Sequence, residues 1–295
     1  MALWENRCKI AISGVGYSKV TRSADIPLAA HALEAVKGAV ADSGLRMEDI
    51  DGLSTYPELP ATGHAEVDGI SIVSVNCMMT MLKLPNLTWH IQVGSVNIGG
   101  AVQQAVNALL AGVCKYAVVW RAMHNPRGTY QNLPGQFAAG ATQFTAPYGF
   151  GGPGQGMAVA YTRWLERHGQ SRDKMATLAV TQRNHALMNP NAVDKLQKPL
   201  TEEEYLNSKY VSEPLRMLDS VMVCDGANGV LVTSTENAKR LGVKKMIHPV
   251  GYGEITNFRG AEPLADITVS GFSVAGPRAL KQAEMTPKDV RMIMP

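Results

Sequence analysis

The chain has 295 residues, of which 45% are hydrophobic and 18% are charged, so it is long and apolar enough to build a sizeable core in one large or two smaller domains. Its 28 Lys and Arg residues exceed its 25 Asp and Glu residues by only three, and they form no dense basic run. This charge balance argues against a nucleic-acid partner, which needs a concentrated basic surface.

The cysteines and the N-terminal residues indicate a cellular compartment. The four cysteines form no C-x-x-C pair, which argues against a metal site and a disulfide framework; they are Cys8, Cys77, Cys114 and Cys224. The first thirty residues carry charges and no long apolar core, so we expect no secretory signal peptide, and no apolar run of about 18 residues predicts a membrane span. These features predict a soluble protein of the reducing cytoplasm.

The first elements alternate between strand and helix. An apolar strand is expected over residues 10–15, and apolar residues at helical spacing between Ala32 and Val40 predict a helix that Gly44 ends. A second strand is expected over residues 50–55. The chain therefore begins as an α/β protein.

The next stretch has the pattern of strand, glycine-bearing turn, helix and strand. We expect strands over residues 87–93 and 116–120, and between them a helix whose apolar positions run from Val102 to Leu110 and which Gly112 ends. Units of these lengths are typical of a right-handed crossover between parallel strands.

A long glycine-rich and aromatic segment follows over residues 125–156. Insertions of this length usually serve a binding site or an interface. Helices are expected over residues 157–169 and 172–188, and a strand over residues 229–233.

Two segments near the end of the chain echo two near its start. The stretch "IHPVGYGEITN" (247–257) matches "ISGVGYSKVTR" (12–22) at an offset of 235, and "ALKQAEMTPKDVRMI" (279–293) matches "AVADSGLRMEDIDGL" (39–53) at an offset of 240. Two similar offsets in the same order predict a duplicated α/β half. The second copy ends just after its second strand begins, so we expect the chain to be truncated at its C-terminus.

Several segments resemble the thiolase superfamily, in particular the branch of sterol carrier protein thiolases and thiolase-like lipid-transfer proteins. They occur in the family's order over nearly the whole chain: "IAISGVGYS", "AVQQAVNALLAGVCKYAVVW", "NHALMNPNA", "EPLRMLDSVMVCDGANGVLVTSTENAKRLG" and "MTPKDVRMIMP". The resemblance implies the thiolase fold, with duplicated α/β halves in a layered α-β-α-β-α arrangement and an incomplete second half. Residues 1–242 would form the N-terminal half, with a loop insertion over 125–215, and residues 243–295 would begin the C-terminal half.

The resemblance also places a nucleophile. In the family a cysteine stands at the start of the buried helix of the first half, and laying "AVQQAVNALLAG" on that helix puts the position at Ser95. The nearest cysteines, Cys77 and Cys114, are both more than fifteen residues away. A serine hydroxyl has a much higher pKa than a thiol and needs its own base, so we expect Ser95 to line the pocket rather than to accept an acyl group.

What remains in such a pocket is a helix N-terminus and backbone amides that can hold a thioester carbonyl and stabilise an enolate. Retro-aldol cleavage of a β-hydroxyacyl-CoA needs no nucleophile, and thiolase-like aldolases of steroid side-chain degradation belong to this branch. The resemblance implies a homodimer, a small partner subunit with an OB-fold and a zinc ribbon, and coenzyme A as part of the substrate with no tightly bound cofactor. In these aldolases a tyrosine of a second-half loop transfers the proton, and that loop would follow Pro295.

Two other functions remain open. One is a thiolytic acyltransferase that uses a cysteine outside this chain, and the other is a non-catalytic subunit that binds lipid or acyl-CoA.

Three polar residues are candidates for the site. His124 follows an apolar strand, and loops at the carboxyl ends of parallel strands gather around ligands. His185, in "RNHALMNP", matches a family motif, although a packing role is the alternative. Asn97 could donate to a thioester oxygen, although asparagine in a glycine-bearing turn is often structural.

By the same resemblance, Tyr148, Phe150 and Met157 lie where the family forms its acyl and pantetheine channel, and we expect them to bind substrate; a loop that covers a dimer interface is the alternative. Asp225, in "CDGANG", is expected to be architectural.

Overall fold

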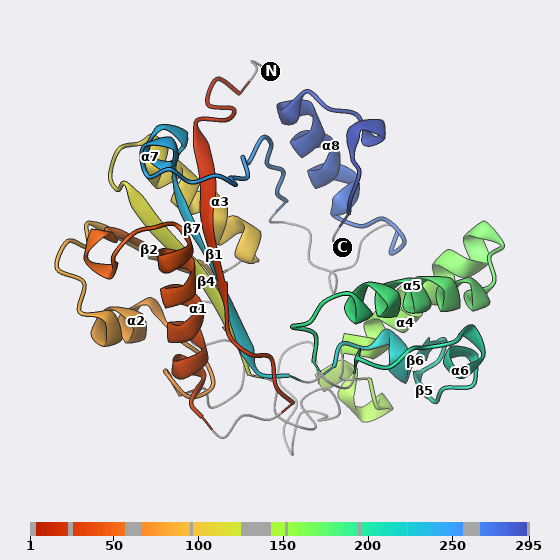
Figure 1. Ribbon diagram of the computed structural model, residues 1–295. Helices are drawn as coiled ribbons and strands as arrows, with labels where there is room; N and C mark the ends of the chain where they lie inside the picture. Colours follow the sequence, from red (N-terminus) through yellow and green to blue (C-terminus); the bar gives the residue numbers. More distant parts are fainter. Residues whose placement is uncertain are drawn as a thin grey trace. The chain divides into compact units, whose positions relative to one another are not determined.

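The computed structural model describes residues 4–22, 26–56, 67–94, 97–124, 143–150, 153–193, 196–222, 224–255 and 266–293. It divides the chain into two compact units (Figure 1). Unit 1 comprises Met1–His124, Asp225–Asn257 and Gly271–Pro295, and unit 2 comprises Asn125–Cys224 and Phe258–Ser270. The predicted insertion falls mainly in unit 2, whereas the predicted boundary between two halves stays a prediction.

Unit 1 is built on a five-stranded sheet in the order β1-β7-β4-β2-β3. Its strands are β1 (Ile10–Tyr17), β2 (Gly52–Thr55), β3 (Trp89–Gln92), β4 (Tyr116–Met123) and β7 (Gly226–Ser234). Strand β2 pairs in parallel with both β3 and β4, while β7 runs antiparallel to β4 and β1. The expected strands are confirmed, and β3 and β4 do run parallel, but β2 lies between them.

Unit 1 contains the helices α1 (Leu28–Asp42), α2 (Val75–Leu82), α3 (Ile98–Leu110), α7 (Thr235–Arg240) and α8 (Phe272–Ala283). Helices α1 and α2 cover one face of the sheet and α3 covers the other (Figure 1). The predicted ends are confirmed, because Gly44 and Gly112 both take positive φ angles, of 74° and 75°. Helix α2 was not expected from the sequence, although Ser74 caps it by accepting a hydrogen bond from the N–H of Cys77.

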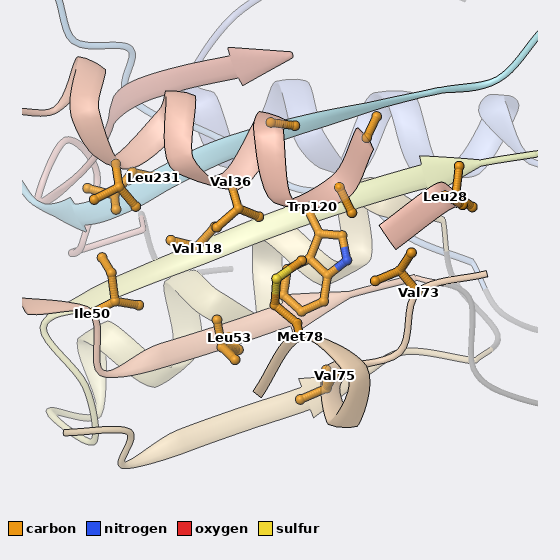
Figure 2. Close-up of a cluster of buried hydrophobic side chains, with 14 residues drawn as sticks. Leu28, Val36, Ile50, Leu53, Val73, Val75, Met78, Val118, Trp120 and Leu231 are labelled. Carbon is orange, nitrogen blue, oxygen red and sulfur yellow. The ribbon is translucent and has the colours of Figure 1, made fainter. Parts of the chain in front are cut away.

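The face under α1 holds the larger of two apolar clusters. Figure 2 shows the indole of Trp120 among side chains of α1, α2 and the neighbouring strands, with Leu28 and Val36 contributed by α1. Trp120 is fully buried, and removing a buried side chain of this size costs about 3–5 kcal/mol. The second cluster lies under α3 and includes Ala101, Ala105 and Val119. Alternate residues of β4 therefore face the two helix layers.

Unit 2 is mainly helical. It contains α4 (Pro153–His168), α5 (Met175–Leu187), α6 (Glu202–Leu206) and a small hairpin of β5 (Tyr210–Ser212) and β6 (Leu215–Arg216). Both expected helices are confirmed, with α4 starting four residues earlier. A buried phenol ties the unit together, because Tyr205 donates a hydrogen bond to Asp219 over 2.5 Å.

Two segments of unit 1 pack on their helices in the same way. A Cβ atom placed on Gly14 would come 2.2 Å from the carbonyl oxygen of Ala39, and one placed on Gly251 would come 2.2 Å from that of Ala279. Both positions exclude any side chain, because the helix backbone passes directly over them. This shared geometry supports the predicted duplication.

The match also corrects one predicted register. The equivalent glycines are 237 residues apart (251 minus 14), so the strand offset of 235 is wrong, whereas the helix offset of 240 is confirmed. After each helix the chain turns at a residue of positive φ, Gly44 at 74° and Glu284 at 57°. Each turn then leads to a short 3-10 helix ending in a capping aspartate, Asp49 or Asp289. The offset of 235 aligns residues of the same type, whereas the structure aligns the glycines that lie directly against each helix.

Among the helices of the described part, none is long and apolar enough to cross a bilayer.

Candidate active site

The carboxyl ends of the parallel strands define one edge of the sheet, here called the carboxyl edge. Strands β2, β3 and β4 end there at Thr55, Gln92 and Met123. Helix α3 begins at the same edge, since it follows β3. The hydroxyl of Ser54 donates to the carbonyl oxygen of Ala101 over 2.9 Å, which holds the first turn of α3 against β2. Ligands of α/β folds gather at edges of this kind.

The start of α3 is the predicted pocket. Ser95 itself lies outside the described residues. Asn97 is the N-cap of the helix, and its side-chain oxygen accepts a hydrogen bond from the N–H of Gly99 over 2.8 Å. The structural role that was the alternative for Asn97 is therefore present, and contact between its amide and a substrate stays a prediction.

His124 and Asp225 form a hydrogen-bonded pair at the carboxyl edge. Nδ1 of His124 lies 2.7 Å from Oδ1 of Asp225, and the side chains are 33% and 4% exposed. An ionised carboxylate can only accept hydrogen bonds, so the shared proton is carried by Nδ1. The pair thus combines a reachable imidazole with a buried carboxylate that orients it.

Asp225 is held in place by its own backbone. Strand β7 runs antiparallel to β4, so its first residue follows Asp225 at the carboxyl edge. The N–H and carbonyl of Asp225 pair with those of Thr21 at 2.7 and 3.0 Å. The architectural role expected for Asp225 is therefore present in the backbone, while the role of the side chain toward His124 was missed. The signal was an acidic residue directly before a buried strand.

Arg121 is a second residue that sequence reasoning missed. Its parity with Val119 places it on the α3 face of β4, where its guanidinium carbon lies 5.2 Å from the ring centroid of Tyr56. The side chain is half-buried. Within the described residues it forms no ion pair or hydrogen bond, and a guanidinium in this state attracts an anion. The alternation of buried and half-buried residues along β4 was the available signal.

The described cysteines differ in burial. Burial, with a smaller effect of the nearby Asp51, raises the pKa of Cys114 to about 12, and burial also raises the pKa of Cys77. Neither thiol is suited to nucleophilic attack near neutral pH. Cys8 is exposed in the N-terminal segment, and Cys224 is half-buried immediately before Asp225. Cys224 therefore lies at the carboxyl edge, directly beside the His124–Asp225 pair.

The remaining predicted residues belong to unit 2. Phe150 lines a groove of about 880 Å³ with residues of α4, whereas Tyr148 is 86% exposed and Met157 is 65% exposed, and neither lines the groove. His185 is exposed on the last turn of α5. His185 and His124 therefore belong to different units, and the site roles of these four unit 2 residues stay predictions.

The groove of unit 2 is polar, and its two arginines already have partners. Arg163 lies 3.7 Å from Glu166, while Arg167 binds the carboxylate of Asp266. Hydrogen bonds from Thr268 and from Arg167 lower the pKa of Asp266 to about 2. The groove therefore offers less free positive charge than the surroundings of Arg121.

A second groove, of about 610 Å³, lies at the opposite end of the strands, here called the amino edge. Asp51 lines it, and its carboxylate accepts hydrogen bonds from the backbone N–H groups of Lys115 and Tyr116 at 2.7 to 2.9 Å. These bonds join β2 to the start of β4. These bonds occupy the carboxylate, so Asp51 has a structural role in this groove.

No model of a known protein family matches the chain. Several individual proteins are similar to it in sequence. The chain is 31% identical over 239 residues to a steroid side-chain-cleaving aldolase of Thermomonospora curvata, covering 78% of this chain and 58% of the relative. It is 27% identical to a 17-hydroxy-3-oxo-4-pregnene-20-carboxyl-CoA lyase of Mycobacterium tuberculosis, over 95% of this chain and 73% of the relative. It is 28% identical to the benzoylsuccinyl-CoA thiolase subunit BbsB of Thauera aromatica, over 82% of this chain and 60% of that subunit.

Solved structures agree. The structure of an Ltp2-ChsH2(DUF35) aldolase matches with a TM-score of 0.77 and 26% identity, over 96% of this chain and 72% of that chain. A monomeric SCP2-thiolase-like protein of Mycobacterium smegmatis matches with a TM-score of 0.67 and 20% identity, over 96% of this chain and 58% of that chain, and supports the fold alone. The chain has the thiolase fold, and it resembles the thiolase-like branch of the thiolase superfamily.

Proposed function

We propose that the protein cleaves a carbon–carbon bond of a β-hydroxyacyl-CoA by a retro-aldol reaction. Removal of the β-hydroxyl proton forms a carbonyl group at Cβ, while the electron pair of the Cα–Cβ bond moves to Cα and the thioester becomes an enolate. Protonation of the enolate at Cα yields a shortened acyl-CoA. The reaction needs groups that move protons and groups that stabilise an oxyanion, and no enzyme nucleophile.

The observation that carries the proposal is the presence of two electropositive groups at the carboxyl edge. The N-terminus of α3 carries the partial positive charge of a helix start, and the guanidinium of Arg121 lies on the same face of the sheet. Both features suit an enolate oxygen. Ser95, at the position that holds the nucleophile in related thiolases, adds no thiol to this edge.

The relatives indicate the substrate class. Both the Thermomonospora and the Mycobacterium relatives are named for cleaving steroid side chains or steroid acyl-CoA compounds. In 17-hydroxy-3-oxo-4-pregnene-20-carboxyl-CoA, the hydroxyl lies β to the thioester. Retro-aldol cleavage would break the C17–C20 bond and release a 17-ketosteroid and propionyl-CoA. We propose a bulky β-hydroxyacyl-CoA of this type, bound through its coenzyme A and with no other cofactor.

Thiolytic acyl transfer is the second candidate. It is favoured by the place of Cys224 beside Asp225 and by the similarity to the Thauera thiolase subunit. This reaction would pass through an acyl group bound to a cysteine and would consume free coenzyme A.

One experiment separates the candidates. The full-length protein is incubated with 17-hydroxy-3-oxo-4-pregnene-20-carboxyl-CoA and, in a separate reaction, with a β-ketoacyl-CoA, the substrate class that thiolysis requires. Both reactions are run with and without free coenzyme A, and products and intact protein mass are followed by mass spectrometry. We expect ketone and propionyl-CoA without added coenzyme A and with no acyl adduct. An adduct that disappears in Cys224→Ser, together with a requirement for coenzyme A, would establish the thiolytic reaction instead.

Assembly and compartment are further proposals. The matched aldolase structure is named with a DUF35 partner, and we propose a homodimer in the cytoplasm that binds a small OB-fold and zinc-ribbon subunit of that kind. We also propose residues 1–242 as the first half of the fold and residues 243–295 as the start of the second. A protein that binds acyl-CoA but releases no carbonyl product from β-hydroxy or β-keto thioesters would be a binding subunit.

A further inference from the structure

We propose that His124 is the general base of the retro-aldol step and that Asp225 positions it. This inference rests on the proposed function and names the group that receives the proton. It replaces the expectation that a tyrosine beyond residue 295 does so.

The geometry fixes which nitrogen can act. Asp225 occupies Nδ1 of His124 at 2.7 Å, so Nδ1 is the donor and Nε2 keeps its lone pair in the neutral ring. Within the described part of the chain Nε2 makes no hydrogen bond. One third of the side chain is exposed, so a ligand can reach this nitrogen.

The carboxylate is well placed to orient the ring. Asp225 as a whole residue is 3% exposed, and both its N–H and its carbonyl form hydrogen bonds with the backbone of Thr21. Its backbone is therefore held in place independently of the side chain. A buried carboxylate beside an imidazole fixes the tautomer and stabilises the imidazolium that forms when Nε2 takes a proton. Asp225 would therefore keep Nε2 of His124 directed away from the carboxylate and available to a substrate hydroxyl.

Another described histidine near this edge does not offer the same chemistry. His31 is 3% exposed, and its Nδ1 is bonded to the hydroxyl of Ser18, which in turn accepts a hydrogen bond from the N–H of Ala227. A substrate cannot reach this ring without disrupting the start of α1. His31 is therefore a packing residue, and His124 is the reachable base.

The proton and electron changes balance without a further reactant. The O–H bond of the β-hydroxyl breaks and its proton moves to Nε2, while the oxygen forms the carbonyl double bond. The Cα–Cβ bond breaks and its electron pair forms the enolate. The imidazolium then returns the proton to Cα, directly or through water, which restores His124 for the next cycle.

The test is chemical rescue in the full-length protein, with 17-hydroxy-3-oxo-4-pregnene-20-carboxyl-CoA as the probe. His124→Ala is expected to lower kcat about 100-fold or more with little change in KM, and added imidazole is expected to restore a substantial part of it. His124→Gln should show the same loss while preserving most of the side-chain volume. Asp225→Asn should lower kcat at least about tenfold, because it disturbs the tautomer and the imidazolium.

A matched control comes from the edge strand of the same sheet. His90 is exposed on β3, and His90→Gln should keep the activity of the unaltered protein. Wild-type activity that survives in both His124 variants would overturn the base assignment and leave the retro-aldol function standing. The base assignment would also be overturned if imidazole did not restore the lost activity in His124 variants that unfold at the same urea concentration as the wild type. An unaltered protein that cleaves no β-hydroxyacyl-CoA would refute the function itself.

Discussion

Two aspartates at opposite edges of one sheet show how the same side chain takes different roles. At the amino edge, the carboxylate of Asp51 accepts hydrogen bonds from the backbone N–H groups of Lys115 and Tyr116. At the carboxyl edge, the backbone of Asp225 forms hydrogen bonds with that of Thr21, and its carboxylate is hydrogen-bonded to the imidazole of His124. The first arrangement joins two strands, and the second orients a group that can carry a proton.

The difference lies in what the partner can do. A backbone N–H cannot titrate or reach a ligand, so a carboxylate that binds it contributes to stability only. An imidazole can do both. A substitution of Asp51 should therefore change unfolding and leave catalysis intact, whereas a substitution of the Asp225 carboxylate should lower catalysis.

The largest contrast concerns thiol chemistry at the amino edge. Burial and Asp51 raise the pKa of Cys114 to about 12, which lowers its thiolate fraction at pH 8 by roughly a thousandfold relative to an ordinary thiol. We expect iodoacetamide to modify exposed Cys8 in the folded protein and to reach Cys114 only after unfolding. Peptide mapping of the alkylated protein measures both rates. Equal labelling of the two cysteines in folded protein would show that the amino edge is open.

Asp51→Ala should destabilise the protein by about 2–3 kcal/mol, since hydrogen bonds to a charged acceptor contribute about 1.5–3 kcal/mol each and this site is half-exposed. Urea unfolding measures the change. Asp51→Asn retains one acceptor oxygen and should lose about half as much. Both variants should keep the wild-type kcat on the steroid probe, and a kcat loss as large as that of Asp225→Asn would remove the distinction between the edges.

The sequence predicted what depends on local patterns. Apolar alternation and helical spacing located the five strands of the sheet and α1 and α3, and the glycines at 44 and 112 located their ends, because positive φ at a helix C-terminus favours glycine. Helix α2 was missed because it has only eight residues, too few for the apolar spacing to repeat as it does in a longer helix.

The sequence could not predict pairings between distant residues. His124 and Asp225 are 101 positions apart, and only the antiparallel placement of β7 beside β4 brings them together. Each residue had a plausible separate interpretation. The register of the repeat failed for a related reason, since the steric requirement at Gly251 is visible only when Ala279 lies over it.

At the carboxyl edge, Asn97→Ala should cost about 1 kcal/mol through loss of the α3 cap, and Asn97→Ser should restore most of it. The serine variant keeps the cap and removes the side-chain amide. If the amide also contacts the thioester, kcat/KM of Asn97→Ser should fall about tenfold while its unfolding midpoint stays close to that of the wild type. Wild-type kcat/KM in this variant would restrict Asn97 to the cap.

The smallest effect concerns the two matched capping aspartates, Asp49 and Asp289. Hydrogen bonds from the backbone and side chain of Arg46 lower the pKa of Asp49, and those of Thr286 lower the pKa of Asp289. A folded pKa below the unfolded value gives stability that is present above the unfolded pKa, near 4, and is lost as the pH falls through the folded pKa. Asp49→Asn and Asp289→Asn should each slightly reduce the loss of stability between pH 6 and pH 2 in urea unfolding. Equal reductions would show that the repeated turn acts locally, because the contribution would then depend on the capping residues and not on the different surroundings of the two copies.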